Sequence, residues 1–160
     1  MQNAFGNDMN RPSPEQIPRP ALWLGYAGLL PFIGLTLGMW FAPERFDGFL
    51  MKVLLSYSAI ILTFTGAIHW ALAMHANGEL ARRHMVFSVI PALIGWGLCI
   101  EFLPPGVALL GFIVGFVVVY LVDMRAVAGN LAPVWYPALR WPLTLIVCLT
   151  LLAAILAHTG

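Results

Sequence analysis

The sequence predicts an all-α protein, a polytopic membrane helix bundle. Of its 160 residues, 61% are hydrophobic and 9% are charged, whereas a soluble globular domain usually carries about 25% charged residues. The apolar residues fall into long runs, and nearly all charges lie in the segments between these runs. A helical span needs about 20 apolar residues, so this chain has room for about five spans with short connections.

The apolar runs place five transmembrane helices at about 21–42, 52–75, 85–102, 106–122 and 141–158. Residues 1–20 contain prolines and amides without the apolar core of a signal peptide, and they predict a disordered cytoplasmic tail before a single transmembrane domain at 21–160. The connection "EFLPPG" cannot continue a helix, so the third and fourth spans form a tight hairpin. Its arms are short, and a re-entrant hairpin over 85–122 stays open as an alternative.

The charges predict that the N-terminus is cytoplasmic and the C-terminus lies on the outer side. In this orientation, most of the arginines face the cytoplasm and few basic residues face outward, as the positive-inside rule requires. The inner set is Arg11, Arg19, Arg82, Arg83, Arg125 and Arg140, and the outer set is Arg45 and Lys52. The acidic residues of the tail argue against a mitochondrial transit peptide and favour a bacterial inner membrane, or the mitochondrial inner membrane if the chain is eukaryotic.

Composition and motifs exclude several classes of function. The formal net charge is +1 and the basic residues are scattered, so we expect the lipid bilayer as the environment and no nucleic-acid partner. The sequence contains no Ser/His/Asp arrangement, no phosphate-binding glycine loop and no pair of facing carboxylates. These observations predict a protein that is not an enzyme.

Two small-residue motifs predict close helix contacts. Gly34 and Gly38 form one GxxxG pair, and Gly111 and Gly115 form another. Such faces let helix backbones approach in lipid, either within one chain or against a membrane-protein partner or a second copy. Packing within the chain is the favoured interpretation.

The most informative polar residue is His69, in the second span. Helical spacing puts Thr65, Gly66 and His69 on one small, polar face, which we expect to point into the bundle. An ionisable residue inside a membrane is a functional candidate by default. A neutral histidine can instead be held by a hydrogen bond to Thr65 or to a carbonyl freed by a proline. The structural interpretation is favoured, and ligand binding, proton transfer or metal coordination is the alternative.

A second polar group is expected at the cytoplasmic ends of the last two spans. Asp123 closes the fourth span and is either a solvated helix end or a partner of Arg140 or Arg82. Tyr136, near the start of the fifth span, completes the candidate polar set. We predict no cofactor and no metal. Haem ligation is disfavoured because the one histidine near the depth of His69 is His84, which would need a distortion of its helix end to act as second ligand.

Pro31 and Pro91 lie inside predicted spans, where each should kink its helix. Kinked helices can enclose a cavity, which Thr65, Gly66, His69 and Trp70 would line between the first three spans. This gives the alternative function, a small-molecule binding or transport protein. Because five spans without an inverted repeat is an unusual transporter plan, it ranks second.

Several stretches together resemble a known family. They are "WLGYAGLLPF", "YSAIILTFTGAIHWALAM", "FSVIPALIGW" and "APVWYPALRWPLT". The chain resembles, over about residues 20–158, the family labelled domain of unknown function 3429, the transmembrane protein 69-like small multi-pass membrane proteins. Where members of that family have Gly directly after the His-Trp pair, this chain has Ala71. The resemblance implies a helical inner-membrane protein and no established reaction. The leading hypothesis is a non-enzymatic structural or accessory component of a membrane assembly.

Overall fold

The computed structural model describes residues 16–100 and 102–159, and over that part of the chain it is helical without β-strands. The all-α prediction is therefore confirmed. Most of the predicted tail, residues 1–15, lies outside the described residues. The helices are α1 (Arg19–Ala27), α2 (Leu30–Phe41), a short 3-10 helix η1 (Glu44–Phe46), α3 (Asp47–Met74), α4 (Gly78–Leu98), α5 (Pro105–Ala128) and α6 (Tyr136–Thr159).

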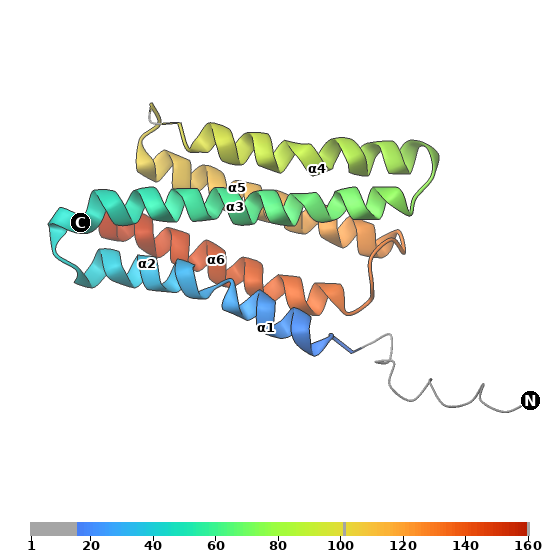
Figure 1. Ribbon diagram of the computed structural model, residues 1–160, viewed down its shortest axis with the longest axis horizontal. Coiled ribbons are helices and arrows are strands. Elements are labelled where there is room, and N and C mark those ends of the chain that lie inside the picture. The colour runs from blue at the N-terminus through green and yellow to red at the C-terminus, as the bar shows by residue number, and fades with distance from the viewer. Residues whose placement is uncertain (1–15, 101, 160) are drawn as a thin grey trace, which may run out of the picture.

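The first predicted span is two helices in line, α1 and α2 (Figure 1). Pro31 lies in the first turn of α2, where its missing N–H costs nothing, and the chain bends just before it. The bend is hydrogen-bonded locally, since Leu29 N–H donates to the Tyr26 carbonyl at 3.0 Å. The predicted kink at Pro31 is thus a break between two helices. Pro91, by contrast, lies inside the continuous helix α4.

The helices do not end where the apolar runs end. Helix α4 begins at Gly78 instead of 85, α5 continues to Ala128 instead of 122, and α6 begins at Tyr136 instead of 141. Hydropathy marks where charged residues begin, but charged residues continue a helix readily, and the helices end near Gly, Asn and Pro. Helix α4 also ends earlier, at Leu98 instead of 102, ahead of the Pro104–Pro105 turn.

Four helical segments are long and apolar enough to cross a membrane: Arg19–Phe41, Glu44–Met74, Pro105–Ala128 and Tyr136–His158. The third predicted span corresponds to α4, which is not among these four segments. Its first turns carry Glu79, Arg82, Arg83 and His84, so its apolar part is shorter than that of the other helices.

The helices form one bundle in which α1 and α2 run in line, and from α2 to α6 each α-helix runs antiparallel to the next one in the chain (Figure 1). Helices α3 and α4 make the most extensive contact, α5 packs on α6 and α3, and α2 packs on α3 and α6. The α3–α4 and α5–α6 connections lie at the end where α1 starts. The α2–α3 and α4–α5 connections lie at the opposite end, where α6 finishes.

Small residues determine how closely the helices approach. A Cβ atom on Gly66 would lie 2.6 Å from Cγ of the Pro91 ring, so the glycine lets the backbone of α3 pack directly against the Pro91 ring of α4. Gly38, Gly111 and Gly115 face the side chains of Leu50, Leu98 and Leu62. Three of the four GxxxG glycines are thus covered by leucines of the same chain, which removes them as sites for a partner or a second copy. Gly34 has nothing within 4 Å of its Cβ position.

Candidate functional site

The α3–α4 hairpin brings two histidines face to face. The turn lies at His75–Asn77, and Gly78 follows with a φ of +61°, a left-handed conformation that suits glycine. Residues equally far from an antiparallel turn lie side by side, and His69 and His84 satisfy that condition. Their Nδ1 atoms are 3.0 Å apart, and both side chains are buried.

The two imidazole rings meet edge to edge. Their planes differ by only 13°, yet their centroids are 5.2 Å apart, well beyond the 3.0 Å that separates the Nδ1 atoms. Rings stacked face to face would bring their centroids about as close as their nearest atoms. The nitrogen lone pairs therefore lie in a common plane and point at each other, which is the geometry of an N–H···N hydrogen bond.

Asp123, from α5, is the centre of a polar network with 0% of its surface exposed. Arg140 Nε, from α6, donates to Asp123 Oδ2 at 2.7 Å. His69 Nε2 lies 3.2 Å from the other carboxylate oxygen, Oδ1. Of the two arginines considered as partners for Asp123, the structure pairs it with Arg140, while Arg82 pairs with Glu79 on the surface. The network therefore joins α3, α4, α5 and α6.

Hydrogen-bond chemistry assigns the protons of this network. Asp123 is a carboxylate, because a charged guanidinium lies against it in a buried site. His69 Nε2 faces that anion at 3.2 Å without a hydrogen bond of normal geometry, and a neutral His69 keeps its proton on this nitrogen because a bare lone pair there would face a carboxylate oxygen. In a neutral imidazole the other nitrogen is then an acceptor, so His69 Nδ1 accepts from His84 Nδ1–H. The chain of donors runs from His84 through His69 to Asp123.

Tyr136 completes the network from the first turn of α6. Its side chain is buried, and its hydroxyl lies beside the Asp123 carboxylate without a hydrogen bond of normal geometry. The Arg140 guanidinium carbon lies 6.0 Å from the centroid of the Tyr136 ring, and Arg140 Nη2 is buried without a partner. The candidate residues Asp123, Tyr136 and Arg140 thus lie together, and we call the set of His69, His84, Asp123, Tyr136 and Arg140 the polar network.

The other predicted site residues lie apart from the network. Thr65 donates to the Leu62 carbonyl of its own helix at 2.9 Å, so it does not hold His69. Gly66 faces Pro91, and the Trp70 side chain points outward with 48% of its surface exposed. The expectation that a proline-freed carbonyl or Thr65 would hold His69 is wrong, because its Nδ1 bonds His84 and its Nε2 faces Asp123 Oδ1 at 3.2 Å.

The cavity expected between the first three spans is also different from the prediction. A cavity of about 120 Å³ lies beside Thr65, between α1, α2, α3, α5 and α6, and Arg140 and Thr144 also line it. Of the four residues expected to line a cavity, only Thr65 does so here. Helix α4 packs too closely on α3 at Gly66 to leave space beside His69.

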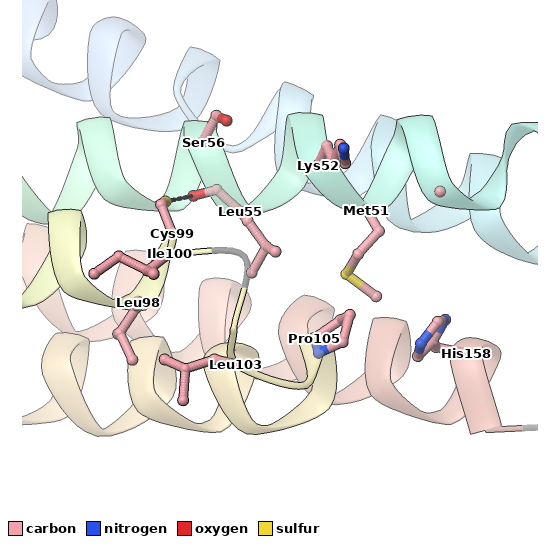
Figure 2. Close-up of a pocket in the computed structure, with 11 residues that line it drawn as sticks. Met51, Lys52, Leu55, Ser56, Leu98, Cys99, Ile100, Leu103, Pro105 and His158 are labelled. Carbon is pink, nitrogen blue, oxygen red and sulfur yellow. Dashed lines mark hydrogen bonds between the residues drawn. The ribbon is translucent and has the colours of Figure 1, made fainter.

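A larger pocket of about 520 Å³ lies at the opposite end of the bundle, between α3, the α4–α5 connection and the end of α6 (Figure 2). Its lining includes the polar side chains of Lys52, Ser56 and His158 and the apolar side chains of Met51 and Leu103. Cys99 Sγ lies 3.6 Å from the Leu55 carbonyl at its edge. We call the two ends of the molecule the network end and the pocket end.

Sequence reasoning did not include His84 in the site. The apolar run begins at Met85, so the predicted span put His84 at a boundary, whereas it lies in the second turn of α4. Its equal distance from the hairpin turn is the signal that pairs it with His69.

The geometry of the polar network decides whether its side chains could bind a metal ion. No group of three or more His, Cys, Asp or Glu side chains within residues 16–100 and 102–159 is arranged to hold a metal ion. The two Nδ1 atoms point at each other across 3.0 Å, so no position on the line between them lies about 2 Å from both nitrogens, as a metal ion would require. What the arrangement can do is hold helices together and exchange protons.

Comparisons with known proteins agree with the fold. The family described as "Protein of unknown function (DUF3429)" matches residues 17–156. Transmembrane protein 69 of Xenopus tropicalis is 32% identical over 89 residues, covering 51% of this chain and 33% of that protein. The chain thus spans about a third of that relative's length. No solved structure matches. The expected resemblance is confirmed, and the chain belongs to the DUF3429 family of membrane proteins.

Proposed function

We propose that this protein is a non-enzymatic structural or accessory component of a larger membrane assembly. It crosses a bacterial inner membrane, or the mitochondrial inner membrane if the chain is eukaryotic, five times, with α1–α2 and α3 to α6 as the crossings. Its N-terminal side is cytoplasmic and the end of α6 lies outside. The observation that carries the proposal is the polar network, whose buried charges are used to join four helices.

The network supports a structural role because its strongest donors and acceptors face one another. The Asp123 carboxylate accepts a hydrogen bond from Arg140 Nε on Oδ2, and its Oδ1 lies 3.2 Å from His69 Nε2. Buried ionic groups in a membrane persist when they are paired, and such pairs fix one arrangement of the helices. A substrate would have to break these contacts to reach the carboxylate.

The proposed orientation follows from where the basic residues lie. Arg19, Arg82, Arg83 and Arg125 are all near the network end, and Arg45 and Lys52 are near the pocket end. Cys99 is exposed at the pocket end, and Cys148 lies within α6 and is partly covered. A membrane-impermeant maleimide should label Cys99 in intact cells or mitoplasts, with C99S as control. Labelling of Cys99 only in inverted vesicles would contradict the orientation.

The outward face of α2 is the best candidate contact with a partner. Gly34 is open, and Leu37 and Trp40 beside it on α2 are 50% and 53% exposed. A small residue between large apolar ones is the surface that another transmembrane helix fits. The partner we propose is an apolar helix of another membrane protein.

A matched pair of variants tests this contact. The tagged chain, expressed in its own host and extracted in mild detergent, should migrate on native gels in a species heavier than the monomer. G34L should convert it to the monomer and G34A should not, while both keep the monomer's thermal stability. Migration of the wild type as a monomer, or equal behaviour of G34L and wild type, would contradict the proposal.

The pocket in Figure 2 supports a second candidate, a small-molecule or lipid binding protein. Its volume of about 520 Å³ lies in the range of ligand sites, and its polar groups converge from α3 and α6. Added phospholipid should then raise the melting temperature of delipidated wild type more than that of S56W, which fills the pocket. Equal shifts in both proteins would reject this candidate.

A further inference from the structure

The polar network in its neutral form has one proton between the two histidines. His84 Nδ1–H donates to His69 Nδ1 across 3.0 Å, and the coplanar rings align the bond. The Asp123 carboxylate and the Arg140 guanidinium cancel in charge. The five-residue cluster is therefore neutral as long as both imidazoles are neutral.

One further proton fits this arrangement without breaking a hydrogen bond. It adds to the free Nε2 of His84, and a shift of the shared proton toward His69 then places the positive charge beside Asp123. In either form a single proton lies between the two Nδ1 atoms. The carboxylate, with Nε2 of His69 3.2 Å from Oδ1, stabilises the cation.

A second added proton does not fit. Both Nδ1 atoms would then carry hydrogen, and two N–H groups of two cations would point at each other across 3.0 Å. The rings are held in this position by Phe87, whose ring meets His69 edge-on at 4.9 Å, and by the close contact of Gly66 with Pro91. The helices would have to separate before both histidines could be charged.

The two histidines are faced by charged and polar groups from neighbouring helices. From α5 the facing group is Asp123, and from α6 they are Arg140 and Tyr136. On α4 itself, Arg82 and Arg83 point to the surface and pair with Glu79. On α3, His75 is exposed and bonds the Ala71 carbonyl of its own helix. His84 is 8% exposed near the α3–α4 turn, so it is the point of entry.

We propose that His69 and His84 form a binding site for one proton, which enters from the network end through His84 and is held between the two Nδ1 atoms beside Asp123. The ligand is the proton itself, and the site binds the first added proton but not a second.

Nitrogen NMR of the full chain, labelled with ¹⁵N-histidine and reconstituted in nanodiscs, tests the proposal. Titration from about pH 8 to about pH 4.5 should move the ring signals of His69 and His84 together in one step. At the acid end, one of their four ring nitrogens should still be unprotonated. H75Q and H158Q remove the two exposed histidines in turn and assign the signals. H84Q should remove the joint step, whereas H75Q should leave it unchanged.

Two results would overturn the inference in the wild type, without relying on any variant. One is that each ring takes up a full proton independently of the other. The other is that neither ring changes protonation down to about pH 4.5. If H84Q folds and His69 still titrates as it does in wild type, the two rings are not coupled and the site does not exist.

Discussion

The network end and the pocket end of the bundle are built from similar polar residue types with opposite results. At the network end, His69 and Arg140 both lie within hydrogen-bond distance of Asp123, and all three side chains are buried. At the pocket end, Lys52 and His158 line a pocket of about 520 Å³ (Figure 2). Four helices contribute side chains to the first arrangement, and the second is open to its surroundings.

The difference follows from how closely the helices approach. Near the network, Gly66 brings α3 onto the ring of Pro91, a rigid contact that holds the two histidines at bonding distance. At the pocket end, α4 ends at Leu98 and α5 begins at Pro105, and the pocket lies beside this connection. Close packing of α3 on α4 thus accompanies the buried polar contacts of the network end.

The largest expected effect is loss of the network carboxylate. D123A leaves the Arg140 guanidinium buried without a counter-charge and removes the acceptor of His69. We expect a destabilisation of about 3–5 kcal/mol, measured by reversible unfolding in mixed micelles. H158Q, at the exposed pocket end, is the control and should change stability by no more than about 0.5 kcal/mol. Equal losses of unfolding free energy in D123A and H158Q would contradict the difference between the network end and the pocket end.

An intermediate effect should separate two glycines with nearly equal contacts. The added Cβ would lie 2.6 Å from Pro91 Cγ in G66A and 2.5 Å from Leu98 Cδ2 in G111A. The proline ring cannot move aside, whereas the leucine end can rotate and also lines the pocket. G66A should cost about 1–3 kcal/mol.

G111A should cost less than G66A, and G34A, where nothing lies within 4 Å, should cost least of the three. The comparison is read from unfolding free energies of all three variants in the same micelles. A larger loss in G111A than in G66A would show that α3–α4 packing is not the rigid contact.

The smallest expected effect concerns the surface of the network end. Hydrogen bonds from Arg83 and Arg82 lower the pKa of Glu79 below its usual value. A carboxyl group whose pKa is lower in the folded state stabilises the fold above its unfolded pKa and loses that contribution as the pH falls through the folded pKa. E79Q should therefore lower the melting temperature slightly at neutral pH, and the difference from wild type should vanish in acid. A difference that grows in acid would contradict this sign.

Much of the fold could be predicted from the sequence because hydropathy and the positions of prolines are local signals. They placed the five helical segments, of which four qualify as membrane spans, and also the α4–α5 turn and the bend near Pro31. They did not place helix ends, since charged residues such as Arg82 and Arg140 continue helices that hydropathy cuts short. Helical spacing also put His69 on an inward face correctly, and it is fully buried.

The site was only partly predictable because it depends on contacts between helices. The sequence left Asp123 open as a solvated helix end or a partner of Arg140 or Arg82, and the structure pairs it with Arg140. His84 was excluded from the site by the boundary drawn at Met85, although it lies against His69. The predicted cavity beside Trp70 failed because the approach of α3 to Pro91 is a tertiary contact that one helix's periodicity does not contain.

The central claim is that buried charges join the helices at the network end as one unit, and a double-mutant cycle on Asp123 and Arg140 tests it most directly. Unfolding free energies of wild type, D123N, R140Q and the double variant are compared in the same micelles. Each single variant leaves the other residue of the pair buried without its counter-charge. We therefore predict that the double variant loses about 1–3 kcal/mol less unfolding free energy than the sum of the two single losses. Losses that add to within about 0.5 kcal/mol would contradict the claim.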